Sequence, residues 1–155
     1  MKAVLAESYC ASVPFILEWN NWVPLKVNIM AWKSEIGRLP TLMALRSKDV
    51  HVGSVVCKLC GSEEESSEHL FTSCFFASHV WQAVAAWCKV SPIYAFSIKD
   101  LLMAHKEQRM DRRLKKVFNG VLMTVCWGIW KARNEAVFFG ATVNVAKTIT
   151  MEDIK

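Results

Sequence analysis

The spacing of apolar residues in the first half of the chain predicts two short helices. Val27, Met30 and Ile36 recur at intervals close to three and four residues, which is the period of an amphipathic helix. Pro24 suits the first turn of this helix and Gly37 suits its end. A second short helix is predicted to follow, with Pro40 and Thr41 at its start and Leu42 and Leu45 on its apolar face.

The periodicity is stronger after residue 75. The segment 76–89 reads FASHVWQAVAAWCK and predicts a helix with one face in the core. That face consists of Val80, Trp81, Val84, Trp87 and Cys88. Further on, Ser97 and Asp100 have the spacing of a capping box and predict the start of a helix that runs through Met103.

The longest helix is predicted between Lys106 and Trp130, with Gly140 near its frayed end. Its apolar positions recur at intervals of four, three, four and four residues, and they are Met110, Leu114, Val117, Val121 and Val125. Strand patterns are scarce and are limited to short runs such as residues 51–56. The pattern therefore predicts a mainly α fold.

Composition narrows the class of protein. A chain of 155 residues with 53% apolar residues and seven tryptophans is large enough for one folded core. The most apolar stretch, residues 117–130, is shorter than the ~20 residues that span a bilayer, and Glu7 interrupts the apolar run near the N-terminus. We expect an intracellular protein of the nucleus or cytoplasm that is neither secreted nor bound to a membrane.

Cysteine usage agrees with a reducing compartment. Cys10, Cys88 and Cys126 stand singly in apolar surroundings and do not suggest a disulfide framework. The other three cysteines belong to a Cys-x2-Cys-x8-His-x4-Cys pattern formed by Cys57, Cys60, His69 and Cys74. Three thiolates and one imidazole are the ligand set of a closed, four-coordinate structural zinc site. The pattern predicts one Zn²⁺ held by a turn inserted into a small helical domain.

The spacing has a local explanation. Two cysteines separated by two residues can share a tight turn, and Gly61 after the second supplies the backbone freedom that such a turn needs. Ser66 or Ser67 can cap a short helix that carries His69, with Cys74 about one turn further on.

Two other interpretations of these cysteines exist. The pair at 57 and 60 could be redox-active, although a redox pair needs neither the histidine nor the third thiol. The thiols could also be simply buried, but the run from Ser62 to Glu68 between the ligands is polar and reads as unsuited to a buried position. His79 is an alternative fourth ligand in place of Cys74.

Charge suggests a second function. The net charge is +5 and the isoelectric point is about 8.9, and segment 106–116 carries six basic and two acidic residues. We expect its basic side chains to contact the phosphates of RNA or DNA. These candidate residues are Lys106, Arg109, Arg112, Arg113, Lys115 and Lys116, of which Lys106, Arg109, Arg113 and Lys116 are expected to share one helical stripe. The alternative is that the stripe is an ordinary solvated face. Residues 57–74 have a net charge of −3 and are expected to repel phosphates.

The order of several motifs resembles a known family. The strings WVPLKVNIMAWKSEIGRLPT, CKLCG and ESSEHLFTSC, followed by the Trp81 helix and WGIWKARNEAVF, are similar to the reverse transcriptase zinc-binding domain of plant LINE-type (non-LTR) retrotransposon polyproteins. The resemblance covers roughly residues 19–138. It implies that Cys57, Cys60, His69 and Cys74 match the metal ligands of the family. It also implies polymerase or ribonuclease H domains of a parent polyprotein as partners.

The resemblance also suggests a division of the chain. Residues 1–18 do not resemble the family, residues 19–90 form the zinc-binding domain, residues 91–140 form a helical extension packed on it, and residues 141–155 form a tail. We find neither the paired aspartates of a polymerase palm nor a nuclease carboxylate cluster. We therefore expect a fragment or remnant of such a polyprotein.

No enzyme activity is predicted. His51, His79 and His105 have no nearby nucleophile or carboxylate pattern that would form a catalytic relay, and there is no glycine-rich phosphate loop. We expect a structural zinc module with auxiliary nucleic-acid binding and no small-molecule substrate. The alternatives are a zinc-stapled protein-interaction module, exposing Trp19, Trp22 or the face of Trp127 and Trp130, and a remnant without function.

Overall fold

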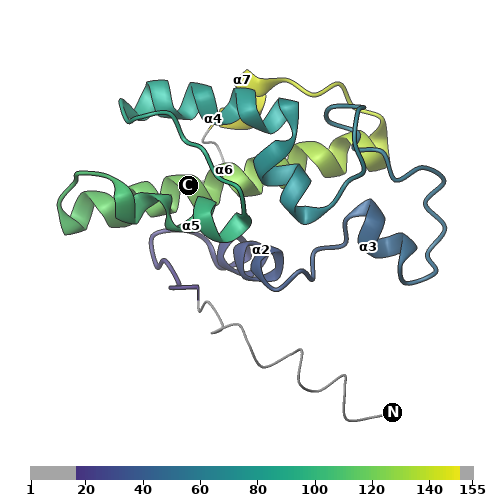
Figure 1. Ribbon diagram of the computed structural model, residues 1–155, viewed down its shortest axis with the longest axis horizontal. Coiled ribbons are helices and arrows are strands. Elements are labelled where there is room, and N and C mark those ends of the chain that lie inside the picture. The colour runs from purple at the N-terminus through teal and green to yellow at the C-terminus, as the bar shows by residue number, and fades with distance from the viewer. Residues whose placement is uncertain (1–16, 151–155) are drawn as a thin grey trace, which may run out of the picture.

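The computed structural model describes residues 17–150, and in that range the chain is mainly helical, as predicted (Figure 1). Cys10, most of the 1–18 segment and residues 151–155 lie outside the described residues. The elements are α2 (Leu25–Glu35), α3 (Leu42–Arg46), the π-helical turn η1 (His69–Ser73), α4 (Phe75–Cys88), α5 (Ile98–Glu107), α6 (Arg112–Phe139) and α7 (Val145–Ile149). The strand-like run 51–56 contributes only one antiparallel bridge, between Val56 and Glu64, to the part of the chain that is described.

The longest helix, α6, runs through the middle of the molecule (Figure 1). Helices α2 and α5 contact α6 and each other, while α7 contacts both α4 and α6. Buried apolar side chains from α2, α4, α5, α6 and η1 form one core, against which the partly buried Val145 and Ile149 of α7 pack. Its fully buried members include Leu70, Phe71, Val80, Val84, Leu101, Leu122 and Ile129. No helix within residues 17–150 has both the length and the apolar character needed to cross a membrane.

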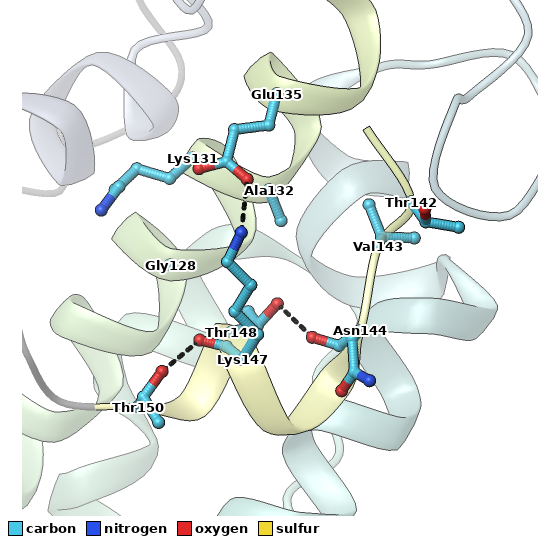
Figure 2. A pocket seen from close by; sticks show the side chains of 10 residues that line it. All are labelled: Gly128, Lys131, Ala132, Glu135, Thr142, Val143, Asn144, Lys147, Thr148 and Thr150. Atoms are coloured by element: carbon cyan, nitrogen blue, oxygen red, sulfur yellow. Dashed lines mark hydrogen bonds and ion pairs between the residues drawn. The ribbon is translucent and has the colours of Figure 1, made fainter. Parts of the chain in front are cut away.

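The short C-terminal helix α7 packs against α6 at Gly128. A Cβ atom at this position would lie 2.6 Å from the carbonyl oxygen of Thr148, so glycine allows the two backbones to approach. The small pocket beside this contact is shown in Figure 2, where Lys147 of α7 reaches Glu135 of α6 at 3.4 Å. The segment predicted only as a tail thus contains a docked helical turn.

Several predicted helix ends agree with the structure. Gly37 has a positive φ of 66° after α2, and the Thr41 hydroxyl accepts a hydrogen bond from the Ala44 N–H at the start of α3. Ser97 caps α5 by accepting from the Asp100 N–H at 3.1 Å. Gly140, with φ of 62°, follows the last residue of α6. Capping residues therefore locate these ends from the sequence.

The single helix predicted from Lys106 to Trp130 is wrong. Helix α5 ends at Glu107 and α6 begins at Arg112, where the Asp111 carboxylate accepts a hydrogen bond from the Leu114 N–H at 2.9 Å. The apolar period continues across this break, which conceals the Asp111 cap. The stripe of Lys106, Arg109, Arg113 and Lys116 therefore does not exist as predicted, because these residues are divided between α5, the connection and α6.

The break also changes the buried face of the helix. Leu114 is 52% exposed and Val117 is exposed as well, although both were predicted to lie on the apolar face of the helix. Val125 is buried as predicted, and the buried side chains of α6 also include Phe118, Leu122, Cys126 and Ile129. Ile36 and Trp87 are also exposed although they were predicted to lie on apolar faces, whereas Trp81 is buried as predicted. Helical spacing predicts a face, but it does not predict how much of that face other elements cover.

A buried ion pair joins the candidate metal-binding segment, residues 57–74, to α6. Glu65 and Arg133 have side chains with 0% and 1% relative exposure. Both the Nε and a terminal nitrogen of Arg133 donate to Glu65 Oε1, at 2.9 and 2.7 Å. The same oxygen accepts from the Leu42 N–H at 2.9 Å, and Arg133 also donates to the Pro40 carbonyl at 3.2 Å. The expectation that the run 62–68 is unsuited to burial is therefore wrong at Glu65.

The fold requires both members of this pair, although the pair itself adds little net stability. Moving two charges out of water costs several kcal/mol each, and the attraction between them offsets that cost only if both are present. The face of Trp130, 4.7 Å from the Arg133 guanidinium carbon, adds a cation–π contact. Removal of either partner leaves a buried charge without its counterpart.

We expect Arg133→Met to lower the free energy of unfolding by about 3–5 kcal/mol, because Glu65 then remains buried and unpaired. The double variant Glu65→Gln/Arg133→Met should recover part of that loss, since it removes the buried charge. Urea denaturation of zinc-loaded protein measures both. Arg113→Met, on an exposed site of the same helix, is the matched control. Equal losses in Arg113→Met and Arg133→Met would contradict this account.

Candidate metal centre

The four residues predicted as metal ligands lie together. The sulfur atoms of Cys57, Cys60 and Cys74 and a ring nitrogen of His69 are all within 4.8 Å of one another. Cys57 Sγ and Cys74 Sγ are 3.9 Å apart, and Cys60 Sγ is 3.3 Å from His69 Nε2. All except Cys60 are buried, and Cys60 is half-buried. The structure thus assembles the predicted ligand set.

The first two ligands come from a tight turn. The Gly61 N–H donates to the Cys57 carbonyl at 2.8 Å, and the Cys57 N–H donates to the Glu63 carbonyl at 2.7 Å. Gly61 has the positive φ, 68°, that the sequence predicts. These bonds fold residues 57–63 back on themselves and point both thiols to one side.

The second two ligands come from the π-helical turn η1. In an α-helix, residues five apart are separated by about 140° around the axis, so His69 and Cys74 would diverge. Here the Cys74 N–H donates to the His69 carbonyl at 2.7 Å, which is the i to i+5 bond of a π turn. This wider turn brings the two side chains to the same site. Ser66 caps the turn by accepting from the His69 N–H at 3.0 Å, as one of the two predicted serines.

Hydrogen bonds to sulfur prepare the site for a cation. The Cys74 thiol and, to a smaller extent, the N–H groups of Cys60 and Leu59 stabilise the Cys57 thiolate and hold the pKa of Cys57 well below its usual value, against the effect of burial. The same hydrogen bond raises the pKa of Cys74, and burial raises it further. A metal ion bound here would displace thiol protons, since cysteines coordinate as thiolates.

His69 is held by groups on the far side of its ring. Its Nε2 faces the cysteines, while its Nδ1 lies 3.2 Å from Glu63 Oε2 and 3.3 Å from Ser73 Oγ. A carboxylate at Nδ1 favours the tautomer that leaves Nε2 free to bind a metal, and it fixes the ring orientation. The sequence did not predict this role for Glu63.

Each glutamate of the predicted solvated run has its own partner. Glu63 contacts His69, and Glu64 pairs with Arg46 at 3.8 Å. Glu65 pairs with Arg133, and Glu68 Oε2 accepts from the Ile98 N–H at the start of α5 at 2.8 Å. The run therefore connects the metal cluster to α3, α5 and α6.

Other residues considered as ligands lie elsewhere. His79 is not part of the cluster, since its Nδ1 lies 2.9 Å from the Phe75 carbonyl oxygen of the preceding turn. Burial raises the pKa of Cys88, and burial raises that of Cys126 to about 12, so neither is poised as a thiolate. The alternative with His79 as fourth ligand is not supported by the geometry.

Comparison with known families supports part of the resemblance. Residues 7–81 match the family described as zinc-binding in reverse transcriptase. The matched range includes all four clustered residues but just under half of the chain. Compared with the range 19–90 that the sequence predicted for this domain, the matched range starts twelve residues earlier and ends nine residues earlier. No curated protein and no solved structure matches the chain.

The cluster fits the metal named by the reverse transcriptase zinc-binding family. Tetrahedral Zn²⁺ with Zn–S bonds of about 2.3 Å and a Zn–N bond of about 2.0–2.1 Å places its ligand atoms roughly 3.5–3.8 Å apart. The contacts of 3.9 and 3.3 Å are close to these separations. With four protein ligands the site has no open position for a water molecule.

The basic residues predicted to bind nucleic acid are only partly brought together. Lys106, Arg112, Lys115 and Lys116 line one groove where α5 meets α6. Arg109 and Arg113 are exposed but do not line it. The groove also includes Trp19, which the sequence singled out only as a residue that loss of neighbouring domains could expose.

We expect Glu63→Ala to weaken zinc binding by about ten-fold, the lower end of the range for groups that orient a ligand. Competition with a chromogenic zinc chelator measures the affinity, with Cys60→Ser as the reference for loss of a ligand. Glu64→Ala makes the same change of charge, but Glu64 pairs with Arg46 rather than with a ligand. Equal weakening in both glutamate variants would show a general charge effect and contradict a specific role for Glu63.

Proposed function

We propose that this chain is a structural zinc-binding module derived from the reverse transcriptase polyprotein of a plant LINE-type retrotransposon, and that it assists nucleic-acid binding. The observation that carries the binding proposal is the groove lined by Lys106, Arg112, Lys115 and Lys116. Such side chains contact phosphates with little dependence on sequence. The family match at residues 7–81 supports the origin of the module.

Zinc has a structural role in this proposal. Three thiolates and a neutral imidazole give the Zn²⁺ centre one net negative charge, which makes it a poor Lewis acid. In zinc-finger peptides binding of such an ion supplies on the order of 10 kcal/mol of folding free energy. The ion would hold the Cys57–Cys60 turn against η1. Glutamates of residues 63–68 would then position this segment against α5, through Glu68, and against α6, through Glu65.

The two functions belong to different regions of the molecule. The metal-binding segment has a net negative charge and its glutamates already have partners. The basic groove lies at the junction of α5 and α6. We therefore propose that nucleic acid contacts the groove rather than the metal-binding turn. Polymerase or ribonuclease H domains of a parent polyprotein would be further partners.

We expect zinc-loaded protein to bind RNA and DNA with an affinity that falls steeply between about 50 and 200 mM salt. Replacing Lys106, Lys115 and Lys116 together by glutamine should weaken binding and flatten the salt dependence. Fluorescence anisotropy, with metal content determined on the same preparation, measures both effects.

The matched control replaces Lys33, Lys48 and Lys89 by glutamine. These lysines are exposed and lie outside the groove, so the net charge changes equally. If both triple variants lose the same affinity, binding follows overall charge and not the groove. If zinc-loaded wild-type protein binds neither RNA nor DNA at the lower salt, nucleic-acid binding is excluded.

A second candidate function is protein association through exposed aromatic residues. Tyr94 and Phe96, in the connection between α4 and α5, are 83% and 95% exposed. They adjoin a hollow of about 240 Å³ lined also by Phe71 and Trp81. Exposed apolar patches of this kind favour association. The face of Trp127 and Trp130 is not such a patch, because Trp130 is buried.

Light scattering over a range of concentrations tests this second function. We expect the mass to rise with concentration if the aromatic connection associates, and Tyr94→Ser/Phe96→Ser to abolish the rise. A strictly monomeric wild-type protein at high concentration would argue against association.

A further inference from the structure

The groove at the junction of α5 and α6 differs from a flat basic surface because it is concave and contains an aromatic residue. It has a volume of about 490 Å³ and is lined on one side by residues 18–20 and on the other by the end of α5 and the first turns of α6. Its basic lining residues stand beside Trp19, whose side chain is 54% exposed. Next to it, the Lys116 ammonium lies 5.9 Å from the centre of the exposed Trp22 ring.

The backbone that carries Trp19 is fixed in place. Asn20 is buried, and its side-chain amide donates to the Lys116 carbonyl and to Asn119 Oδ1, both at 3.0 Å. Its main-chain N–H donates to Asn28 Oδ1 at 2.9 Å, and the Asn28 amide donates back to the Asn20 carbonyl. Three asparagines thus tie residue 20 to both α2 and α6.

A glycine leaves room for this attachment. A Cβ atom at Gly120 would lie 3.3 Å from the amide nitrogen of Asn20 and 3.3 Å from a methyl carbon of Val23. The absence of a side chain at this turn of α6 lets the loop approach the helix. The backbone at Trp19 is therefore already ordered next to the lysines, which lowers the entropic cost of binding a ligand there.

One acidic residue opposes anion binding in the groove. Glu18 lies 3.7 Å from the Lys106 ammonium and is itself part of the lining. Lys115 donates to the Lys106 carbonyl at 3.0 Å, which holds the two lysines close together. A phosphate in the groove would compete with the Glu18 carboxylate for Lys106.

Building on the proposed function, we infer that this groove binds one strand of nucleic acid, with a base stacked on Trp19 and the phosphates at Lys106, Lys115 and Lys116. An aromatic ring beside a line of cations is the arrangement that binds single strands without sequence readout, since every base has a face that can stack. In a duplex the bases are already stacked and paired, so Trp19 would have none to contact. The groove should therefore prefer a single strand to a duplex.

The experiment compares a short oligouridine, the matching oligothymidine and a DNA duplex of the same length, each at about 50 and 200 mM salt. We expect the single strands to bind more tightly than the duplex. Trp19→Ala should weaken single-strand binding by about ten-fold with an unchanged salt slope, because stacking is lost while the phosphate contacts remain. Trp87→Ala, at an exposed tryptophan outside the groove, should leave the affinity unchanged.

Glu18→Gln provides an independent test, because it is expected to raise the affinity rather than to lower it. It should strengthen binding several-fold at low salt, because Lys106 no longer has a competing carboxylate. Equal affinity for strand and duplex, together with wild-type binding by Trp19→Ala, would overturn the inference while leaving nucleic-acid binding intact. Absence of binding by the wild-type protein would overturn the proposed function as well. Zinc content and helical circular dichroism show whether each variant is folded.

Discussion

The fold depends on the neutralisation of one buried carboxylate. Glu65 lies between the Cys57–Cys60 turn and η1, and it is completely buried, so the metal-binding segment can pack only where a cation and hydrogen-bond donors meet it. Arg133 supplies the cation from α6, and Leu42 supplies a backbone N–H. The part of the chain that resembles a zinc-binding domain is therefore completed by a helix that lies after the matched range 7–81. Segments far apart in the sequence form one cooperative unit.

The candidate metal cluster could be predicted from the sequence because the spacing of its cysteines and histidine is that of a metal site. Cys57, Cys60, His69 and Cys74 need only local turns to meet, and each turn has a signal such as Gly61 or Ser66. The groups around the ligands were not predictable in this way. A glutamate in a polar run has the same local pattern whether it faces solvent or, like Glu65, a partner 68 residues away. Long-range electrostatic pairing leaves no local pattern.

In the helices, too, features set by nearby residues could be predicted, whereas features set by distant elements could not. Capping residues located several ends, because a cap acts within three residues of the end it stabilises. The break between α5 and α6 was missed because the apolar period continued across residues 108–111, although Asp111 carries a capping signal. The extent of burial was missed for Trp87, since exposure depends on which other elements reach that turn. The sequence names the basic residues as candidates, but only the fold decides which of them share a groove with Trp19.

The π turn of η1 has a consequence for how this sequence can change during evolution. The extra residue in this turn is what aligns His69 with Cys74. Deletion of one residue between them would restore ordinary α-helical bonding and a His-x3-Cys spacing, which also places two side chains on one face. Insertion of one residue would instead separate the pair. The ligand spacing in this segment can therefore shorten by one residue more easily than it can lengthen.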